Sequence, residues 1–233
     1  MHRALSILPA LLVFSLAGVA QETEDPLEGV NRFIYGFNEK ADQWLVRPLA
    51  QGYHWVLPDP AERAVGRFFG NLREVSNSVN HLLQGKPGSA TNSGGRFLIN
   101  STLGLAGFLD VASDLGLPAE DDEDIGQTLA VWGVGSGPYV VIPFLGPSTL
   151  RDAPSRWADR YLEPVNYLED QASQNIAKGV ELLDIRAGLL NSDQMSTSDR
   201  YVFMRDVWLQ RREYLINDGQ VEDDFSDGGF LDD

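Results

Sequence analysis

The residues that could carry out catalytic chemistry are few and isolated. The chain has three histidines and no cysteine, and neither His54 nor His81 lies in a metal-ligand spacing such as H-E-x-x-H. Ser136 lies in the sequence GVGSG, but its flanking positions are Val134 and Pro138, where a nucleophile elbow requires glycines. The spacing matches neither a dinucleotide-binding nor a P-loop pattern. We therefore predict a protein that is not an enzyme, with no catalytic residues, no metal site and no cofactor.

Acidic residues dominate the charge of the chain. The formal net charge of −16 argues against a nucleic-acid partner and against broad adsorption to anionic lipid headgroups. Residues 120–124, EDDED, are five consecutive acids. A calcium site is conceivable there, but the spacing is not that of an EF-hand loop. We expect these acids to form a solvated loop.

Residues 125–152 are the most unusual stretch of the chain. Glycine and proline recur so often that neither a continuous helix nor a central strand is expected, yet the residues between them are apolar. Irregular apolar backbone must satisfy its polar groups, and at membrane depth it is tolerated only inside protein or along a cavity. Two interpretations remain open at this point: a non-helical hairpin lining an apolar passage, or a strand or loop in a soluble core.

The remaining chain predicts helices that could position this stretch. A helix is expected from 25 to 46, with Asp25 and Pro26 at its start and Arg47-Pro48 ending or kinking it. Gly85 and Pro87 mark the end of another helix. The expected helical ranges are 25–46, 48–56, 59–84, 149–161, 164–190 and 199–216. Together they predict a mainly α, single-domain protein interrupted by one irregular apolar Gly/Pro hairpin.

The two ends of the chain read as separate segments. Residues 1–20 have a weakly basic start, an apolar run and small residues at Gly18 and Ala20, which is typical of a cleaved secretory signal peptide. Retention as an uncleaved anchor is the alternative. Residues 21–217 form the expected helical domain, and 218–233 are expected to be an acidic, disordered tail.

Five ordered sequence blocks give the chain a family resemblance. They are DPLEGVNRFIYGFNEKAD (25–42), the Arg47-Pro48 step, VNHLLQGKP (79–87), RFLINSTLGLAGFLDVAS (96–113) and GQTLAVWGVGSGPYVVIPFLGPSTLRD (126–152). The chain resembles the VacJ/MlaA family of Gram-negative outer-membrane lipoproteins over nearly all of 25–219. The last block, with its G-x-G-x-G-P-Y and S/T-L-R-D motifs, is the most specific.

This resemblance implies a ring of helices in the inner leaflet of the outer membrane, around a central amphipathic channel. A mislocalised glycerophospholipid would leave the outer leaflet through the channel and pass to a soluble periplasmic carrier, so that lipid asymmetry is maintained. An inner-membrane ABC transporter would return the lipid. The implied partners are a trimeric porin and the carrier protein, and the implied location is the periplasmic face of the outer membrane or the periplasm.

Specific residues can be assigned expected roles on this basis. A phospholipid needs apolar walls for its chains and polar contacts for its headgroup. Phe37 and Asn38 match the family segment that tunes channel opening, although Phe37 could simply be the core face of its helix. Arg96, Asn100 and Arg151, with Asn38, are the hypothesised headgroup contacts, and each could equally be a capping or ion-pair residue. The expected channel-lining hairpin residues are Gly135, Gly137, Pro138, Tyr139, Val141, Ile142, Pro143, Phe144 and Gly146.

One departure from the family pattern affects anchoring. Val19 follows Leu16-Ala17-Gly18, where family members carry the lipid-bearing cysteine, and no cysteine occurs elsewhere. Anchoring would then rely on the apolar rim of the protein, a porin partner or an uncleaved N-terminal segment. A soluble periplasmic lipid carrier is the second hypothesis, and a structural or adhesion-type protein is the third. A lipase using Ser136 ranks last.

Overall fold

The computed structural model describes residues 25–191 and 199–220, and it confirms a mainly α fold. The predicted signal peptide, 1–20, lies outside the described residues, and so does all of the predicted tail, 218–233, except residues 218–220. The helices are α1 (Glu28–Ala41), α2 (Arg47–Val56), α3 (Asp59–Leu83), α4 (Pro87–Thr102), α5 (Val111–Asp114), α6 (Ile125–Val131), α7 (Asp152–Asp159), α8 (Gln171–Gly188) and α9 (Arg200–Ile216). A two-stranded antiparallel sheet joins β1 (Tyr139–Ile142) to β2 (Gly146–Thr149).

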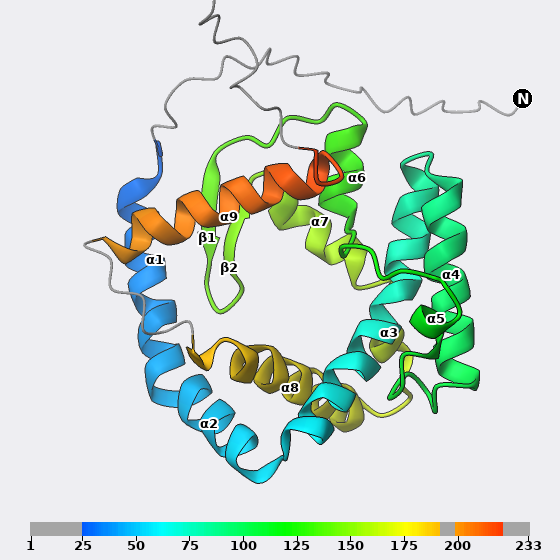
Figure 1. The fold of residues 1–233 in the computed structure, drawn as a ribbon. Coiled ribbons are helices and arrows are strands. Elements are labelled where there is room, and N and C mark those ends of the chain that lie inside the picture. The colour runs from blue at the N-terminus through cyan, green and yellow to red at the C-terminus, as the bar shows by residue number, and fades with distance from the viewer. Residues whose placement is uncertain (1–24, 192–198, 221–233) are drawn as a thin grey trace, which may run out of the picture.

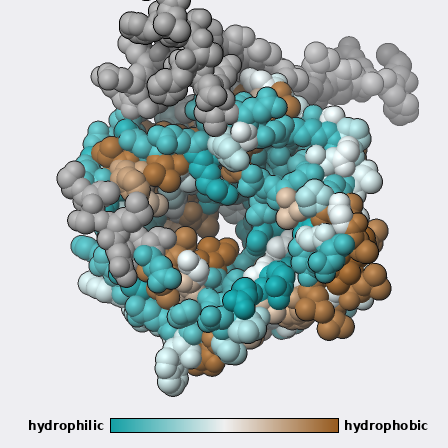
Figure 2. Space-filling model, viewed as in Figure 1, coloured by the Kyte–Doolittle hydropathy of each residue, from teal (hydrophilic) through white to brown (hydrophobic). Residues whose placement is uncertain are grey.

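These elements form a ring (Figure 1). Helices α1, α2 and α3 follow one another around its circumference, α4 packs against α3, and α8 and α9 cross opposite sides. The β hairpin projects from beneath α9 toward the middle of the ring. The space-filling view shows an opening through the molecule, bordered by both hydrophilic and hydrophobic residues (Figure 2). The expected ring of helices with one irregular hairpin is therefore present.

The first side of the ring is one continuous helical rod. A π-helical turn over Asp42–Val46 joins α1 directly to α2, so Arg47-Pro48 changes the helix but does not end it. Proline lacks an N–H donor, and the wider hydrogen-bond spacing of a π turn accommodates that loss. The rod exposes large aromatic side chains, among them Phe33, Trp44 and Trp55. No helix in residues 25–191 and 199–220 has the length and apolar character to cross a bilayer.

Helices α3 and α4 pack through polar side chains. Buried asparagines recur along α3 at Asn71, Asn77 and Asn80, and each binds a neighbouring segment. The Asn71 amide donates to Ser101 Oγ at 2.9 Å, and Thr128 Oγ1 donates to Asn80 Oδ1 at 2.8 Å. Because buried amides need partners, these bonds fix how the segments align.

An apolar cluster lies where the hairpin meets α1 and α9. Tyr139, Val141 and Tyr201 are buried, and Tyr35 and Trp208 pack around them. The rings of Tyr35 and Tyr201 meet edge to face at 5.7 Å between centroids. Arg32 of α1 lies over the Tyr201 ring and pairs with Asp199 at 2.7 Å. These contacts hold one face of β1 against the ring wall.

Two expectations need correction. The range 164–190 is not one helix, because a 3₁₀ turn at Pro164–Tyr167 ends before α8 begins at Gln171. Asp170 caps α8 by accepting from the Ser173 backbone N–H at 2.8 Å, which fixes a new helix start. The acidic run is also not simply solvated: Glu123 is buried, and Asp124 caps α6 by accepting from the Gln127 N–H.

Candidate functional site

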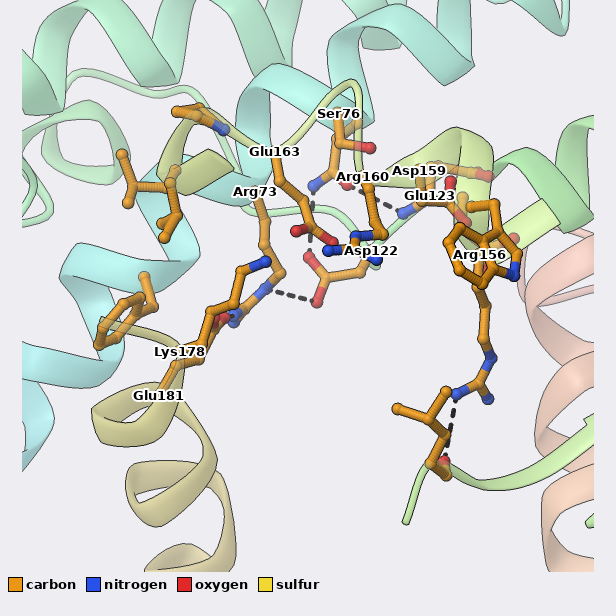
Figure 3. Close-up of a pocket in the computed structure, with 18 of the residues that line it drawn as sticks. Arg73, Ser76, Asp122, Glu123, Arg156, Asp159, Arg160, Glu163, Lys178 and Glu181 are labelled. Atoms are coloured by element: carbon orange, nitrogen blue, oxygen red, sulfur yellow. Dashed lines mark hydrogen bonds and ion pairs between the residues drawn. The ribbon is translucent and has the colours of Figure 1, made fainter. Parts of the chain in front are cut away.

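A cavity of about 1010 Å³ lies in the middle of the ring (Figure 3). Its walls come from α3, the acidic segment before α6, the hairpin tip, α7, the 3₁₀ turn and α8. The apolar wall residues are Phe69, Leu72, Ile142, Leu145, Trp157 and Val165, and the basic ones are Arg73, Arg156, Arg160 and Lys178. Acidic side chains also line it, so the cavity is amphipathic.

One wall of the cavity is an ion-pair network between distant segments. Arg73 of α3 donates to Asp122 Oδ2 at 3.0 Å and to Glu181 Oε1 of α8 at 2.8 Å. The Asn77 amide also donates to Asp122, at 3.3 Å. Burial raises the pKa of Glu181, against the lowering effect of Arg73. The network joins α3 to α8 and fixes charge on the cavity wall, as Figure 3 shows.

Asp159, at the end of α7, is the most perturbed carboxyl group of the cavity. Burial raises its pKa to about 6, although its Oδ1 accepts from the Ile125 N–H at 2.8 Å, which acts in the opposite direction. The neighbouring charges of Asp124 and Glu163 raise the pKa further, and Arg212 lowers it.

Helix α7 presents two guanidinium groups to the cavity. Arg156 donates to the carbonyl oxygens of Leu145 at 3.1 Å and Pro147 at 2.8 Å, both in the hairpin. Burial lowers the pKa of Arg156 below its ordinary value. Arg160 lies over the Trp157 ring, 5.5 Å from its centroid. Figure 3 shows Arg156 pointing toward the hairpin and Arg160 toward Asp122 and Glu163.

The hairpin uses its two faces differently. Tyr139 and Val141 are buried in the apolar cluster, so these two side chains face the core and not the cavity. The reason is the two-residue period of a strand, which sends alternate side chains to opposite faces. Ile142 and Leu145 line the cavity, and Leu145 was absent from the expected set. Gly135, Gly137, Pro138, Pro143 and Phe144 are exposed, and Gly146 is partly exposed.

The expected gating residues contact the hairpin tip directly. The Asn38 amide donates to the Ile142 carbonyl at 3.0 Å, and its Oδ1 accepts from the Phe144 N–H at 2.8 Å. The Phe37 and Phe144 rings meet edge to face at 5.0 Å between centroids. Phe144 has a positive φ of 62°, a conformation that a large side chain rarely adopts. Whether this contact gates a passage remains a prediction.

Arg96 and Asn100 lie together on α4, away from the residues that line the cavity. Arg96 donates to Glu74 Oε1 at 2.6 Å and to the Leu117 carbonyl at 2.6 Å, and it pairs with Asp110 at 3.2 Å. The Asn100 amide donates to Asp110 at 3.0 Å. These bonds tie α4 to the segment around α5, and contact with lipid headgroups remains a prediction.

Arg151 belongs to a second buried charge network. It donates to Asp152 Oδ1 at 2.7 Å, and Arg212 of α9 donates to Asp152 Oδ2 at 2.9 Å. Arg212 also donates to both oxygens of Asp124, at 2.6 and 2.7 Å. The two guanidinium groups lower the pKa of the Asp152 carboxyl group against the effect of burial. The network joins α6, α7 and α9 at their ends.

Sequence reasoning missed most of the cavity wall. Arg156, Trp157 and Arg160 lie in the range that was expected to be helical, but no role was assigned to them. A usable signal was present: two arginines four residues apart, with a tryptophan between them, follow the most specific motif in a strongly acidic chain. Within the described residues, no cluster of side chains could hold a metal ion.

Comparison with known proteins covers nearly all of the described chain. A family model described as MlaA lipoprotein matches residues 23–215. The "Intermembrane phospholipid transport system lipoprotein MlaA" of Escherichia coli (strain K12) is 38% identical over 208 residues, covering 87% of this chain and 82% of that protein. The Haemophilus influenzae protein of the same name is 30% identical over 230 residues, covering 93% and 92%.

A solved structure shares the fold. It comes from work on the structural basis for maintenance of bacterial outer membrane lipid asymmetry. It superposes with a TM-score of 0.75 at 35% sequence identity, covering 84% of this chain and all of that one.

Proposed function

The chain belongs to the MlaA family, and on this premise we propose that it transports phospholipid between membranes. In this proposal it removes mislocalised glycerophospholipid from the outer leaflet of the outer membrane and passes it to a periplasmic carrier. The protein acts as a passage and not as an enzyme. Directionality is supplied by its partners.

The observation that carries this proposal is the amphipathic cavity in the middle of the ring. Its volume of about 1010 Å³ is at the upper end of typical small-molecule pockets, which is about 1,000 Å³. Apolar side chains such as Leu72, Leu145 and Trp157 suit acyl chains, and the guanidinium groups of Arg156 and Arg160 suit a phosphate. A lipid needs both kinds of wall along a single path.

Gating belongs to the same proposal. Phe37 and Asn38 hold the hairpin tip at Phe144, and release of that tip widens the passage. The hairpin residues then line the path, with Ile142 facing the cavity. Arg96, Asn100 and Arg151 remain proposed headgroup contacts, but their bonds to neighbouring segments assign them a supporting role first.

Location and partners complete the proposal. The protein is exported and works at the periplasmic face of the outer membrane, beside a trimeric porin. Because the chain has no cysteine to acylate, its exposed aromatic and aliphatic side chains hold it in the lipid, Trp44 and Trp55 among them. Tryptophan favours the membrane–water interface, which suits such a rim.

Loss of the gene tests the function. Outer-leaflet phospholipid is measured in a strain without the gene, and we expect it to rise and to return to normal with the wild-type chain. A chain with Ile142→Ser and Leu145→Ser changes two cavity-lining side chains of the hairpin and keeps the buried Tyr139 and Val141, so it is expected to fold but not to restore asymmetry. Normal outer-leaflet phospholipid in both the gene-loss strain and the strain with this variant would overturn the proposal.

The absent cysteine favours one second candidate, a soluble periplasmic lipid carrier. Cell fractionation separates the two functions. A membrane component stays with the outer membrane after high-salt washing, whereas a carrier is recovered in the soluble fraction with about one phospholipid per chain. Mass spectrometry of the purified protein identifies both the lipid and the mature N-terminus.

A further inference from the structure

Arg156 has an unusual set of partners for a half-buried guanidinium group. It donates to two neutral acceptors, the carbonyl oxygens of Leu145 and Pro147. Among the described residues, no carboxylate oxygen lies within 4.0 Å of its nitrogens. Burial also lowers the pKa of Arg156 below its ordinary value. Backbone carbonyls are therefore the direct contacts of this positive charge, while the carboxylates of Asp124, Asp152 and Asp159 act on it without contact.

Other buried arginines differ in this respect. Arg96 pairs with Glu74 at 2.6 Å, Arg151 with Asp152 at 2.7 Å, and Arg212 with Asp124 at 2.6 Å. A buried charge is normally compensated in this way. Arg156 also lines the cavity, where it can be reached by a ligand. An anion entering the cavity would be a stronger acceptor for it than a backbone carbonyl, because an anion adds the attraction of opposite charges to the hydrogen bond.

If an anion displaced the hairpin carbonyls from Arg156, the hairpin tip would lose an attachment. The hairpin tip is held from one side by Asn38 of α1, which binds Ile142 and Phe144. Arg156 of α7 holds the other side of the same turn. Of the two residues whose carbonyls Arg156 binds, Leu145 is largely exposed and Pro147 is partly exposed, so the freed carbonyl groups can bond to water. Exchange of partners at Arg156 therefore releases one of the two attachments of the tip.

We propose that Arg156 is a positioning residue that senses cargo: the phosphodiester of an entering phospholipid takes its guanidinium from the hairpin carbonyls and so frees the tip. The proposal rests on the proposed transport function and adds to it how the hairpin responds to lipid. Arg156 acts through the hairpin, and its ligand is the anionic phosphate shared by all glycerophospholipids. The acyl chains supply no part of the signal.

Amide hydrogen exchange of the full chain in dodecyl maltoside micelles tests this. Exchange at Phe144 and Leu145 is followed with and without added phosphatidylglycerol. For the wild type we expect phosphatidylglycerol to speed exchange about tenfold, the effect of losing roughly one charge-assisted bond. In Arg156→Gln, exchange is expected to be fast without lipid and insensitive to it. Arg156→Lys keeps the charge and should respond to lipid from an intermediate starting rate.

Matched variants separate the proposed exchange of partners at Arg156 from general effects of charge. Arg211→Gln removes the same charge from an exposed site on α9, outside the cavity. It should keep the lipid response of the wild type. Asn38→Ala, which frees the other side of the tip, should raise exchange with or without lipid and so shows that the assay detects release. Circular dichroism confirms that each variant is folded.

Two further additives identify the source of the signal. Dioleoylglycerol has the acyl chains but no phosphate, and inorganic phosphate has no chains. We expect neither to speed exchange at the concentration at which phosphatidylglycerol does. An equal response to dioleoylglycerol would overturn the role of the phosphate, and an equal response to inorganic phosphate would overturn the lipid as its source.

The inference and the transport function can fail separately. If the wild-type gene restores outer-leaflet lipid asymmetry while phosphatidylglycerol leaves hydrogen exchange of the hairpin unchanged, the proposed role of Arg156 is wrong and the transport function stands. If hairpin exchange responds to lipid but loss of the gene leaves asymmetry intact, the transport function is wrong.

Discussion

The side-chain oxygen of Asn38 accepts a hydrogen bond from the backbone N–H of Phe144, 106 residues later, at 2.8 Å. The same amide donates to the Ile142 carbonyl, so one side chain of α1 fixes both the donor and the acceptor sides of the hairpin turn. The hydrogen bonding of this turn to α1 therefore depends on one side chain, whereas a β-strand is held in its sheet by many backbone hydrogen bonds.

Replacing Asn38 with alanine is therefore expected to loosen the hairpin tip without unfolding the ring. The loss of two bonds should weaken local protection at Phe144 by about 1–3 kcal/mol. Hydrogen exchange at that amide measures the effect. Asn175→Ala is the control, because Asn175 is an exposed residue bonded only to its own helix. Unchanged protection at Phe144 would show that the ring contact with Phe37 suffices.

Arg96→Met is expected to destabilise the fold strongly. The Arg96 and Glu74 side chains are 7% and 9% exposed, so the substitution leaves a buried carboxylate without its partner and should cost about 3–5 kcal/mol. Arg211→Met breaks an exposed pair with Asp121 and should cost at most about 1 kcal/mol. Urea unfolding compares the two variants. A stable Arg96→Met chain that fails in transport would instead support direct contact with headgroups.

Gly126→Ala should destabilise the junction of α6, α7 and α9. A Cβ atom at this position would lie 2.4 Å from Arg212 Nη2 and 2.6 Å from Asp152 Oδ1. The Arg212 and Asp152 side chains are also hydrogen-bonded to each other. Such overpacking typically costs about 1–3 kcal/mol. Gly29→Ala places the same methyl group on α1 with nothing within 4 Å, and it should be neutral or stabilising by up to about 1 kcal/mol. The thermal unfolding midpoints of both variants, compared with that of the wild type, measure the two effects.

Stability should fall as the pH rises from about 4 to 6 because of Asp159. Its pKa is raised to about 6 in the folded protein from 3.8, so between these values the folded state holds a proton that the unfolded state has lost. Asp159→Asn keeps an oxygen for the Ile125 N–H and should remove this fall. The gain at pH 7 is expected to be about 1 kcal/mol, because partial exposure screens the effect.

Unfolding free energies of wild type and variant across pH 4–7 give this contribution as a difference. Asp121→Asn, in the exposed part of the acidic run, serves as the control for loss of one charge. A constant difference between wild type and Asp159→Asn over the whole range would contradict the assignment.

Local chemistry explains which features the sequence could predict. Gly85, with a φ of 77°, ends α3 as expected, and Asp199 caps α9 through the Tyr201 and Val202 N–H groups. The hairpin followed from the glycine and proline punctuation. The break before α8 was missed because the helical spacing of apolar residues continues across Asp170, although Asp170 caps the start of α8.

The cavity wall could not be predicted because its pairs are long-range. Arg73 meets Glu181 across 108 residues, and nothing in the local pattern of either helix marks the partner. For the same reason, spacing alone could not separate Arg156, which faces the cavity, from Arg151, which is tied into a buried network. Strand alternation could have placed Tyr139 and Val141 on the face opposite Ile142, had the exact strand register been known.

The buried asparagines of α3 fix its distance from the neighbouring wall segment. Asn77 Oδ1 accepts from the Glu123 N–H at 2.9 Å, and Thr128 Oγ1 donates to Asn80 Oδ1 at 2.8 Å. An apolar contact can repack over a range of distances, whereas these hydrogen bonds form at only one side-chain length. Exchange of Asn77 or Asn80 for glutamine adds a methylene group at a buried position, so it should overpack this contact at a cost of about 1–3 kcal/mol.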